Sequence, residues 1–105
     1  MTPYEVIKDA ILNRKTVRAT YQGHPREMCP HVIGLNKRGE QQALCYQFGG
    51  TSSSGLGPDG SAENWRCVRI AGLRDVTSTD GPWHTAPDHS RPQTCVARRD
   101  VEVTF

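Results

Sequence analysis

The chain has 105 residues, which is the usual size of one domain and too few for two independent cores. Hydrophobic residues make up 35% of it, and seven prolines and ten glycines punctuate it. This composition argues against a helical bundle and favours short elements joined by turns and polar loops. The formal net charge of +2 is too small to indicate a nucleic-acid-binding protein by itself.

The distribution of charge is more informative than its total. Between Ala10 and Arg38 six basic residues stand against one acid, Glu27, whereas the rest of the chain is net acidic. The six are Arg14, Lys15, Arg18, Arg26, Lys37 and Arg38. This asymmetry can create a positive face that attracts phosphates or carboxylates, although solvated side chains around a sheet give the same pattern.

The chain shows no signal for membrane insertion or export. No apolar run approaches the roughly 20 residues that span a bilayer. A capped amphipathic segment follows Met1, in place of the basic start and apolar block of a signal peptide. We therefore expect a cytoplasmic protein with no membrane partner, in which the four cysteines stay as thiols. These cysteines are Cys29, Cys45, Cys67 and Cys95.

The N-terminal segment predicts a helix over residues 3–13. Thr2 can cap the free N–H groups, Pro3 fits the first helical position, and Glu5 completes a capping box. Apolar residues then recur at helical spacing, so one stripe can pack on a sheet. These residues are Val6, Ile7, Ala10 and Ile11.

Six later stretches predict short strands. Residues 16–21 alternate cleanly, with Val17, Ala19 and Tyr21 on one face. Pro30 interrupts the second stretch, and because proline cannot donate to a ladder it indicates an edge strand or a bulge. The expected strands cover residues 16–21, 26–35, 42–48, 65–70, 72–79 and 100–105.

Turns and loops join these strands. Residues 22–25 and 36–39 predict tight turns, while residues 49–64 form a glycine- and serine-rich loop of unusual length for a hairpin. Residues 80–99 are polar and punctuated by proline, which indicates an irregular excursion. A helix followed by five or six short strands favours a single, mainly β domain built as a strongly bent barrel over about residues 16–79. The alternative is an open sheet covered by the helix.

Three groups of residues follow the helix in a recognisable order. They are Val17-x-x-x-Tyr21-x-Gly23-x-x-Arg26-x-x-x-Pro30-His31, then Ala43-Leu44-Cys45-Tyr46-Gln47, and finally Trp65-Arg66-x-x-Arg69-Ile70-x-x-Leu73. In order and spacing they resemble the WYL-domain family, in particular its short stand-alone bacterial members. The resemblance covers approximately Val6 to Val76.

This resemblance implies a small SH3-like or Sm-like barrel that serves as a regulatory, ligand-sensing module. Some members of the family recognise single-stranded nucleic acid, and their pocket is lined by aromatic, histidine and arginine side chains. The chain departs from the family in two respects. No helix-turn-helix fits ahead of residue 16, and Leu44-Cys45-Tyr46 occupies the neighbourhood of the Trp-Tyr-Leu trio.

Six side chains are candidates for ligand binding, because guanidinium groups suit phosphate and tyrosine rings can stack on bases. They are Tyr21, Arg26, His31, Tyr46, Arg66 and Arg69. By alternation, however, Tyr21 and Tyr46 fall on apolar faces typical of a core. Arg66 and Arg69 fall on opposite faces of their strand, so one pocket cannot hold both unless the strand bulges. Arg26 and His31 escape this objection, because Pro30 already interrupts their strand.

No cofactor, metal ion or catalytic set is expected. Cys29-Pro30-His31 is a close pair and His84 and His89 lie five apart, but the chain has no Cys-x-x-Cys pair of the kind that structural zinc sites use. Cys29 and His31 meet the geometry of a thiol and its base only loosely, because Pro30 lies between them. We therefore expect a protein that is not an enzyme.

The predicted function is a ligand-binding or regulatory module. Its expected partner is single-stranded nucleic acid or a small nucleotide-like anion, bound near Arg26 and His31. The alternative is a protein-interaction subunit that docks on a protein partner through the barrel surface or the strand edge near Pro30, because fold alone does not determine function.

Overall fold

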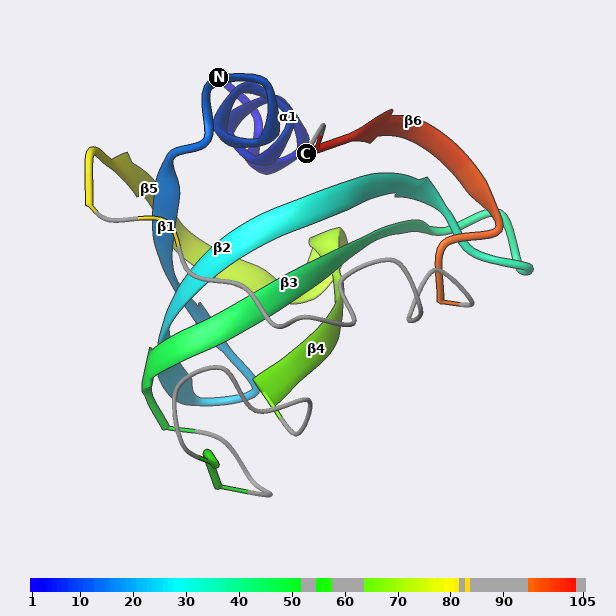
Figure 1. The fold of residues 1–105 in the computed structure, drawn as a ribbon. Helices are drawn as coiled ribbons and strands as arrows, with labels where there is room; N and C mark the ends of the chain where they lie inside the picture. Colours follow the sequence, from blue (N-terminus) through cyan, green and yellow to red (C-terminus); the bar gives the residue numbers. More distant parts are fainter. Residues whose placement is uncertain (52–54, 58–63, 82, 84–94, 104–105) are drawn as a thin grey trace.

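The computed structural model describes residues 1–51, 55–57, 64–81, 83 and 95–103, and it is mainly β with one N-terminal helix (Figure 1). The elements in chain order are α1 (Pro3–Asn13), β1 (Thr16–Tyr21), β2 (His24–Leu35), β3 (Gln41–Gly50), β4 (Trp65–Arg69), the short 3₁₀ helix η2 (Ile70–Gly72), β5 (Leu73–Thr79) and β6 (Arg98–Glu102). In these residues no helix is long and apolar enough to cross a membrane.

Helix α1 begins and ends where the sequence predicts. The Thr2 hydroxyl accepts a hydrogen bond from the Glu5 N–H at 3.2 Å, and the Glu5 carboxylate accepts one from the Thr2 N–H at 2.9 Å. Arg14 ends the helix in the left-handed conformation, with φ of 50°. The helix buries its apolar stripe against the sheet, which confirms the predicted capping box and amphipathic pattern.

The six strands form one antiparallel sheet that does not close. Its strands follow the order β4-β3-β2-β1-β5, and β6 pairs with β2 beside this path. The terminal strands β4 and β5 share no ladder in the described part of the chain; η2 joins them instead. The mainly β architecture is confirmed, whereas the closed barrel is wrong, and α1 packs on the bent open sheet (Figure 1).

Strand β2 is the longest strand and pairs with three others. It pairs with β3 along nearly its whole length, with β1 over its first five residues, and with β6 from Val32 to Leu35. The register against β3 shifts between Pro30 and Val32, which confirms the predicted interruption. Pro30 therefore lies at a bulge in a central strand, and the edge-strand alternative is wrong.

Apolar side chains pack on both faces of β2 and β3. One face joins α1 in the main core, which contains Ile7, Ala10, Ile11, Val17, Ala19, Tyr21, Met28, Ile33, Ala43, Cys45, Val68, Ile70, Leu73 and Val103. On the other face, Tyr46 and Cys29 pack with Trp65, while Leu44 and Val32 pack with Val96. A strand buried on both faces lacks a simple polar–apolar alternation.

Two of the four cysteines form a disulfide, so the expectation of four thiols is wrong. Cys67 on β4 is joined to Cys95, 28 residues later, with their Cα atoms 6.3 Å apart. Cys29 and Cys45 are buried and take no part in a disulfide. The fold brings Cys95 against the β4 face opposite the main core, a proximity that sequence spacing does not reveal.

The C-terminal strand starts earlier than predicted. β6 covers Arg98–Glu102 in place of residues 100–105, so it overlaps the end of the excursion expected over residues 80–99. Most of that excursion, and residues 104–105, lie outside the described residues.

A polar contact links α1 to β6. The Tyr4 hydroxyl donates a hydrogen bond to Asp100 Oδ2 at 2.6 Å, and Lys8 Nζ lies 3.3 Å from the same oxygen. The hydrogen bond from Tyr4 and the contact with Lys8 lower the pKa of Asp100. The raised pKa of Tyr4, about 12, has burial as its main cause, followed by the hydrogen bond to Asp100.

The lowered pKa of Asp100 predicts a pH-dependent stability. A depressed carboxyl pKa contributes stability above the unfolded-state value of about 4, and this contribution disappears as the pH falls through the folded-state pKa. Chemical unfolding at pH 7 and pH 2 should show Asp100→Asn less stable than wild type at pH 7 and equal to it at pH 2. A difference between the two proteins that does not change with pH would contradict this linkage.

The close approach of β6 to Gly34 predicts that a larger residue at this position weakens the pairing of β6 with β2. A Cβ atom at this position would overlap the backbone carbonyl of Arg98, so β2 and β6 can approach this closely only with glycine. Gly34→Ala should cost about 1–3 kcal/mol of stability. Hydrogen exchange should then show lost amide protection in β6 and retained protection in β1 and β3. Full protection of β6 in the variant would contradict the close approach.

Candidate functional site

The side chain of Arg26 lies inside the protein and is 4% exposed. Its guanidinium carbon stands 5.1 Å from the centre of the Tyr21 ring, and its Nη1 donates a long hydrogen bond of 3.4 Å to Gln47 Oε1. Its Nε atom makes no hydrogen bond, and no carboxylate pairs with it, among the residues that the structure describes. Arg26 is therefore a buried cation without an anion in this part of the chain.

This burial is energetically unfavourable unless something compensates for it. A guanidinium group stays charged, so it cannot escape the penalty by losing its proton. Removing the charge from water costs several kcal/mol. The cation–π contact stabilises the buried group by roughly 2 kcal/mol, and the long hydrogen bond to a neutral amide stabilises it by about 1 kcal/mol. An anion bound at Arg26 would offset the remainder.

A second arginine strengthens the positive potential. Arg66 is half-buried on β4 and lies opposite Cys45 in the β3–β4 ladder. Its Nη2 donates to the carbonyl oxygen of Gly55 at 2.6 Å, and its Nη1 donates to that of Trp65 at 3.0 Å. Burial, followed by the charge of Arg66, lowers the pKa of Arg26. The two guanidinium groups therefore act on each other as like charges, and an anion beside them would relieve this repulsion.

Two other described neighbours of Arg26, Gln47 and Cys45, do not supply that anion. Gln47 is fully buried, and its Nε2 donates to the carbonyl oxygens of Gly49 and Thr51, both at 2.9 Å, which turns its neutral Oε1 toward Arg26. Burial raises the pKa of the Cys45 thiol, so this group stays neutral although Arg26 opposes the shift. We call Tyr21, Arg26, Gln47 and Arg66 the arginine cluster.

The arginine cluster predicts an unusual effect on stability. Arg26→Met removes the buried charge and keeps most of the side-chain volume, so the unfolding free energy should equal that of wild type or exceed it by up to about 2 kcal/mol. Urea unfolding measures this difference. A loss of 2 kcal/mol or more would show that contacts within the protein already stabilise the charge, and would contradict a site that awaits a ligand.

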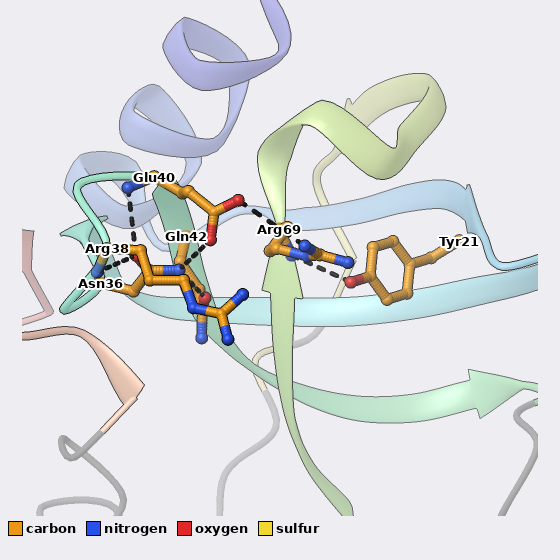
Figure 2. Close-up of polar contacts among 6 residues, drawn as sticks. All are labelled: Tyr21, Asn36, Arg38, Glu40, Gln42 and Arg69. Carbon is orange, nitrogen blue, oxygen red and sulfur yellow. Dashed lines mark hydrogen bonds and ion pairs between the residues drawn. The ribbon is translucent and has the colours of Figure 1, made fainter.

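Tyr21 lies between Arg26 and a groove on the surface. Its hydroxyl accepts a hydrogen bond from the Arg69 backbone N–H at 3.1 Å, so the end of β1 meets the end of β4 (Figure 2). A Cβ atom on Gly72 would lie 2.9 Å from Cε1 of the Tyr21 ring, which shows how closely η2 approaches this ring. The ring thus has Arg26 beside it and the groove along its edge.

The groove has two parts that share a charged pair. The first part, which we call the Glu40 groove, has a volume of about 580 Å³ and is lined by Tyr21, Glu40, Gln41, Arg69, Ala71 and Gly72, among others. The second part, the hairpin hollow, has about 540 Å³ and adds Asn36, Lys37, Arg38 and Gln42 to the shared Glu40 and Arg69. Arg69 Nη1 lies 3.6 Å from Glu40 Oε2, between the two parts (Figure 2).

Asn36 fixes the hairpin that carries Glu40. Its Oδ1 accepts hydrogen bonds from the N–H groups of Arg38 and Glu40, at 2.9 and 3.0 Å. Its Nδ2 donates to Glu40 Oε1 at 3.0 Å and to Gln42 Oε1 at 2.8 Å (Figure 2). An asparagine side chain offers two donors and two acceptor positions, and all four are used here. The Glu40 carboxylate is consequently held in place.

The predicted site residues separate into three places. Tyr21, Arg26 and Arg66 meet in the arginine cluster, while Arg69 points to Glu40, in agreement with the opposite faces expected for Arg66 and Arg69.

His31 and Tyr46 lie in an aromatic cluster on the other face of the sheet. The His31 ring centre is 4.8 Å from those of Trp65 and Trp83, and Tyr46 is 5.1 Å from Trp65. Both side chains are buried. Arg26 and His31, the strongest pair in the sequence, therefore do not share a pocket.

The basic residues between Ala10 and Arg38 do not form one face. Arg18 pairs with Glu27 at 3.8 Å on the surface, and Arg26 is buried. Lys37 and Arg38 lie at the hairpin hollow.

The His31 ring in the aromatic cluster forms a hydrogen bond within the protein. His31 Nδ1 donates to the carbonyl oxygen of Cys29 at 2.8 Å, and the Cys29 side chain is fully buried. Within the described ranges, no three His, Cys, Asp or Glu side chains gather as metal ligands. His84 and His89 lie outside those ranges.

Sequence reasoning missed Gln47, Asn36 and Glu40. Gln47 follows Ala43 and Cys45 on the face of β3 that joins the main core. A polar residue in this apolar alternation indicates a buried polar contact. Asn36 opens a turn that ends at a glycine, a position where asparagine bonds to the backbone ahead. No sequence signal brings Glu40 to Arg69, because that contact depends on the β3–β4 register.

Comparison with protein-family models, with curated proteins and with solved structures found no match for this chain.

Proposed function

We propose that this protein is a ligand-binding or regulatory module that recognises a phosphate-bearing ligand, either nucleic acid or a nucleotide-like anion. The observation that carries the proposal is Arg26, a buried cation that no carboxylate of the described residues neutralises. Arg66, a half-buried residue on β4, adds a second positive charge that acts on Arg26. Arginine pairs bind phosphate oxygens through several charge-assisted hydrogen bonds.

The resemblance to WYL domains supports the same reading, and with it we infer that the bent sheet is a variant of a small SH3-like or Sm-like barrel. Two contacts favour this inference. The short helix η2 joins β4 to β5 where a barrel would need a ladder, and the Tyr21 hydroxyl contacts the end of β4. Arg26 lies near the start of β2 and Arg66 near the start of β4, on strands that would border the interior of such a barrel.

The alternative of a protein-interaction subunit has less support. Among the described residues the large exposed hydrophobic side chains are Met1 and Leu12, which do not form a broad apolar patch. The phosphate-binding proposal therefore takes precedence.

Binding of labelled single-stranded DNA and RNA tests the proposal by fluorescence anisotropy at low and moderate salt. Wild type should bind, and the logarithm of its affinity should fall linearly with the logarithm of the salt concentration. Arg26→Met should weaken binding at least about tenfold, because it removes a buried partner of the phosphate. Inorganic phosphate should compete if the site takes a free anion, and should not compete if it needs an oligonucleotide.

Arg98→Gln provides the matched control, because it removes one positive charge from an exposed position on β6. This variant should bind almost as tightly as wild type. Absence of binding at low salt, or equal losses in the two variants, would contradict the proposal, since equal losses reflect net charge alone.

A further inference from the structure

We propose that the Glu40 groove and the hairpin hollow together bind a guanine nucleotide, with the base in the groove and the phosphate in the hollow. This inference goes beyond the proposed function, because it assigns a second ligand site to the protein. The site uses a different set of side chains, and so it can be tested separately from the arginine cluster.

The Glu40 groove is large enough for a nucleobase, and small and apolar groups line part of it. Its volume of about 580 Å³ falls in the range of roughly 300–1,000 Å³ typical of small-molecule sites. Ala71 and Gly72 form one small-residue wall, and the edge of the Tyr21 ring adds an apolar surface. Such walls suit a planar base, while polar groups at one end fix its orientation.

Glu40 supplies those polar groups. Its Oε1 accepts one hydrogen bond from Asn36, and its Oε2 faces Arg69 at 3.6 Å. A carboxylate has about four acceptor positions, so each oxygen can accept one more hydrogen bond. The side chain is 41% exposed and is held by Asn36, which lowers the entropy lost when a ligand binds.

This carboxylate selects a base with two adjacent donors. Guanine presents its ring N1–H and its 2-amino group side by side, so they can donate to the two oxygens of one carboxylate. Hypoxanthine keeps the ring N–H but lacks the amino group, and adenine presents an acceptor at the ring position. A site that hydrogen-bonds a ligand group discriminates strongly against analogues that lack it.

The hairpin hollow supplies the charge for the phosphate. Lys37, Arg38 and Arg69 line it, against the single acid Glu40. The Arg69 side chain is 57% exposed, and an exposed ion pair contributes little stability, so its guanidinium can turn to a phosphate at low cost. Arg26 lies behind the Tyr21 ring and adds to the positive potential of the groove.

Calorimetric titration with guanosine, inosine and adenosine monophosphates tests this proposal. Wild type should bind the guanosine nucleotide about tenfold more tightly than the inosine nucleotide, the effect of one hydrogen bond to a charged group. Glu40→Gln should abolish this preference, because an amide presents one acceptor and one donor. Glu102→Gln is the matched control, since it neutralises a partly exposed acid that pairs with Arg99 on β6, and it should keep the preference.

The outcomes separate this proposal from the proposed function. Equal affinity for the three nucleotides, a preference that survives in Glu40→Gln, or no nucleotide binding would overturn the guanine site. If oligonucleotide or phosphate binding still depended on Arg26, the proposed function would stand without it. If neither kind of ligand bound, both proposals would fail.

Discussion

The pairing of β2 with three other strands determines where the polar residues lie. A twelve-residue strand that pairs with β1, β3 and β6 must bend, and it does so at the bulge between Pro30 and Val32. Before the bulge, Arg26 points to the side of Tyr21 and the main core; at the bulge, His31 points to Trp65 on the other face. The same strand holds β6 through Gly34. This register shift and an earlier one, between Glu27 and Met28, thus lie along the segment of β2 that joins the arginine cluster to the aromatic cluster.

Charge, rather than shape, distinguishes the arginine cluster from the rest of the sheet. Tyr21 and Gln47 contact Arg26 but carry no negative charge, and burial keeps the Cys45 thiol protonated. The cost of burying a guanidinium exceeds the return from these contacts, which is typical of a site that is completed by a ligand. The Glu40 groove differs in kind, because its charged groups are exposed and paired, and a hydrogen bond from Asn36 holds the Glu40 carboxylate. One place favours an anion in general, and the other can discriminate between ligands.

The sequence predicts the helix and the strands more accurately than it predicts which side chains contact each other. The helix is correct at both ends, and most strands are correct to within two residues, because capping and alternation are local signals. The burial of Arg26 was not predictable, since β2 is buried on both faces and shows no simple alternation. The Cys67–Cys95 disulfide and the Glu40–Arg69 pair depend on strand register and chain return, which spacing does not encode. Opposite faces for Arg66 and Arg69 were predictable, because that inference needs the period of a single strand.

The most direct test of the central claim observes the Arg26 guanidinium itself. Nitrogen–proton NMR spectra of the arginine side chains, recorded while inorganic phosphate or a single-stranded oligonucleotide is added, report the Nε–H group that makes no hydrogen bond within the described residues. The account predicts that the Arg26 Nε–H signal shifts and exchanges more slowly as ligand is added, while that of exposed Arg98 changes little. An Arg26 signal that stays unchanged at saturating ligand would contradict the claim that this buried charge recognises phosphate.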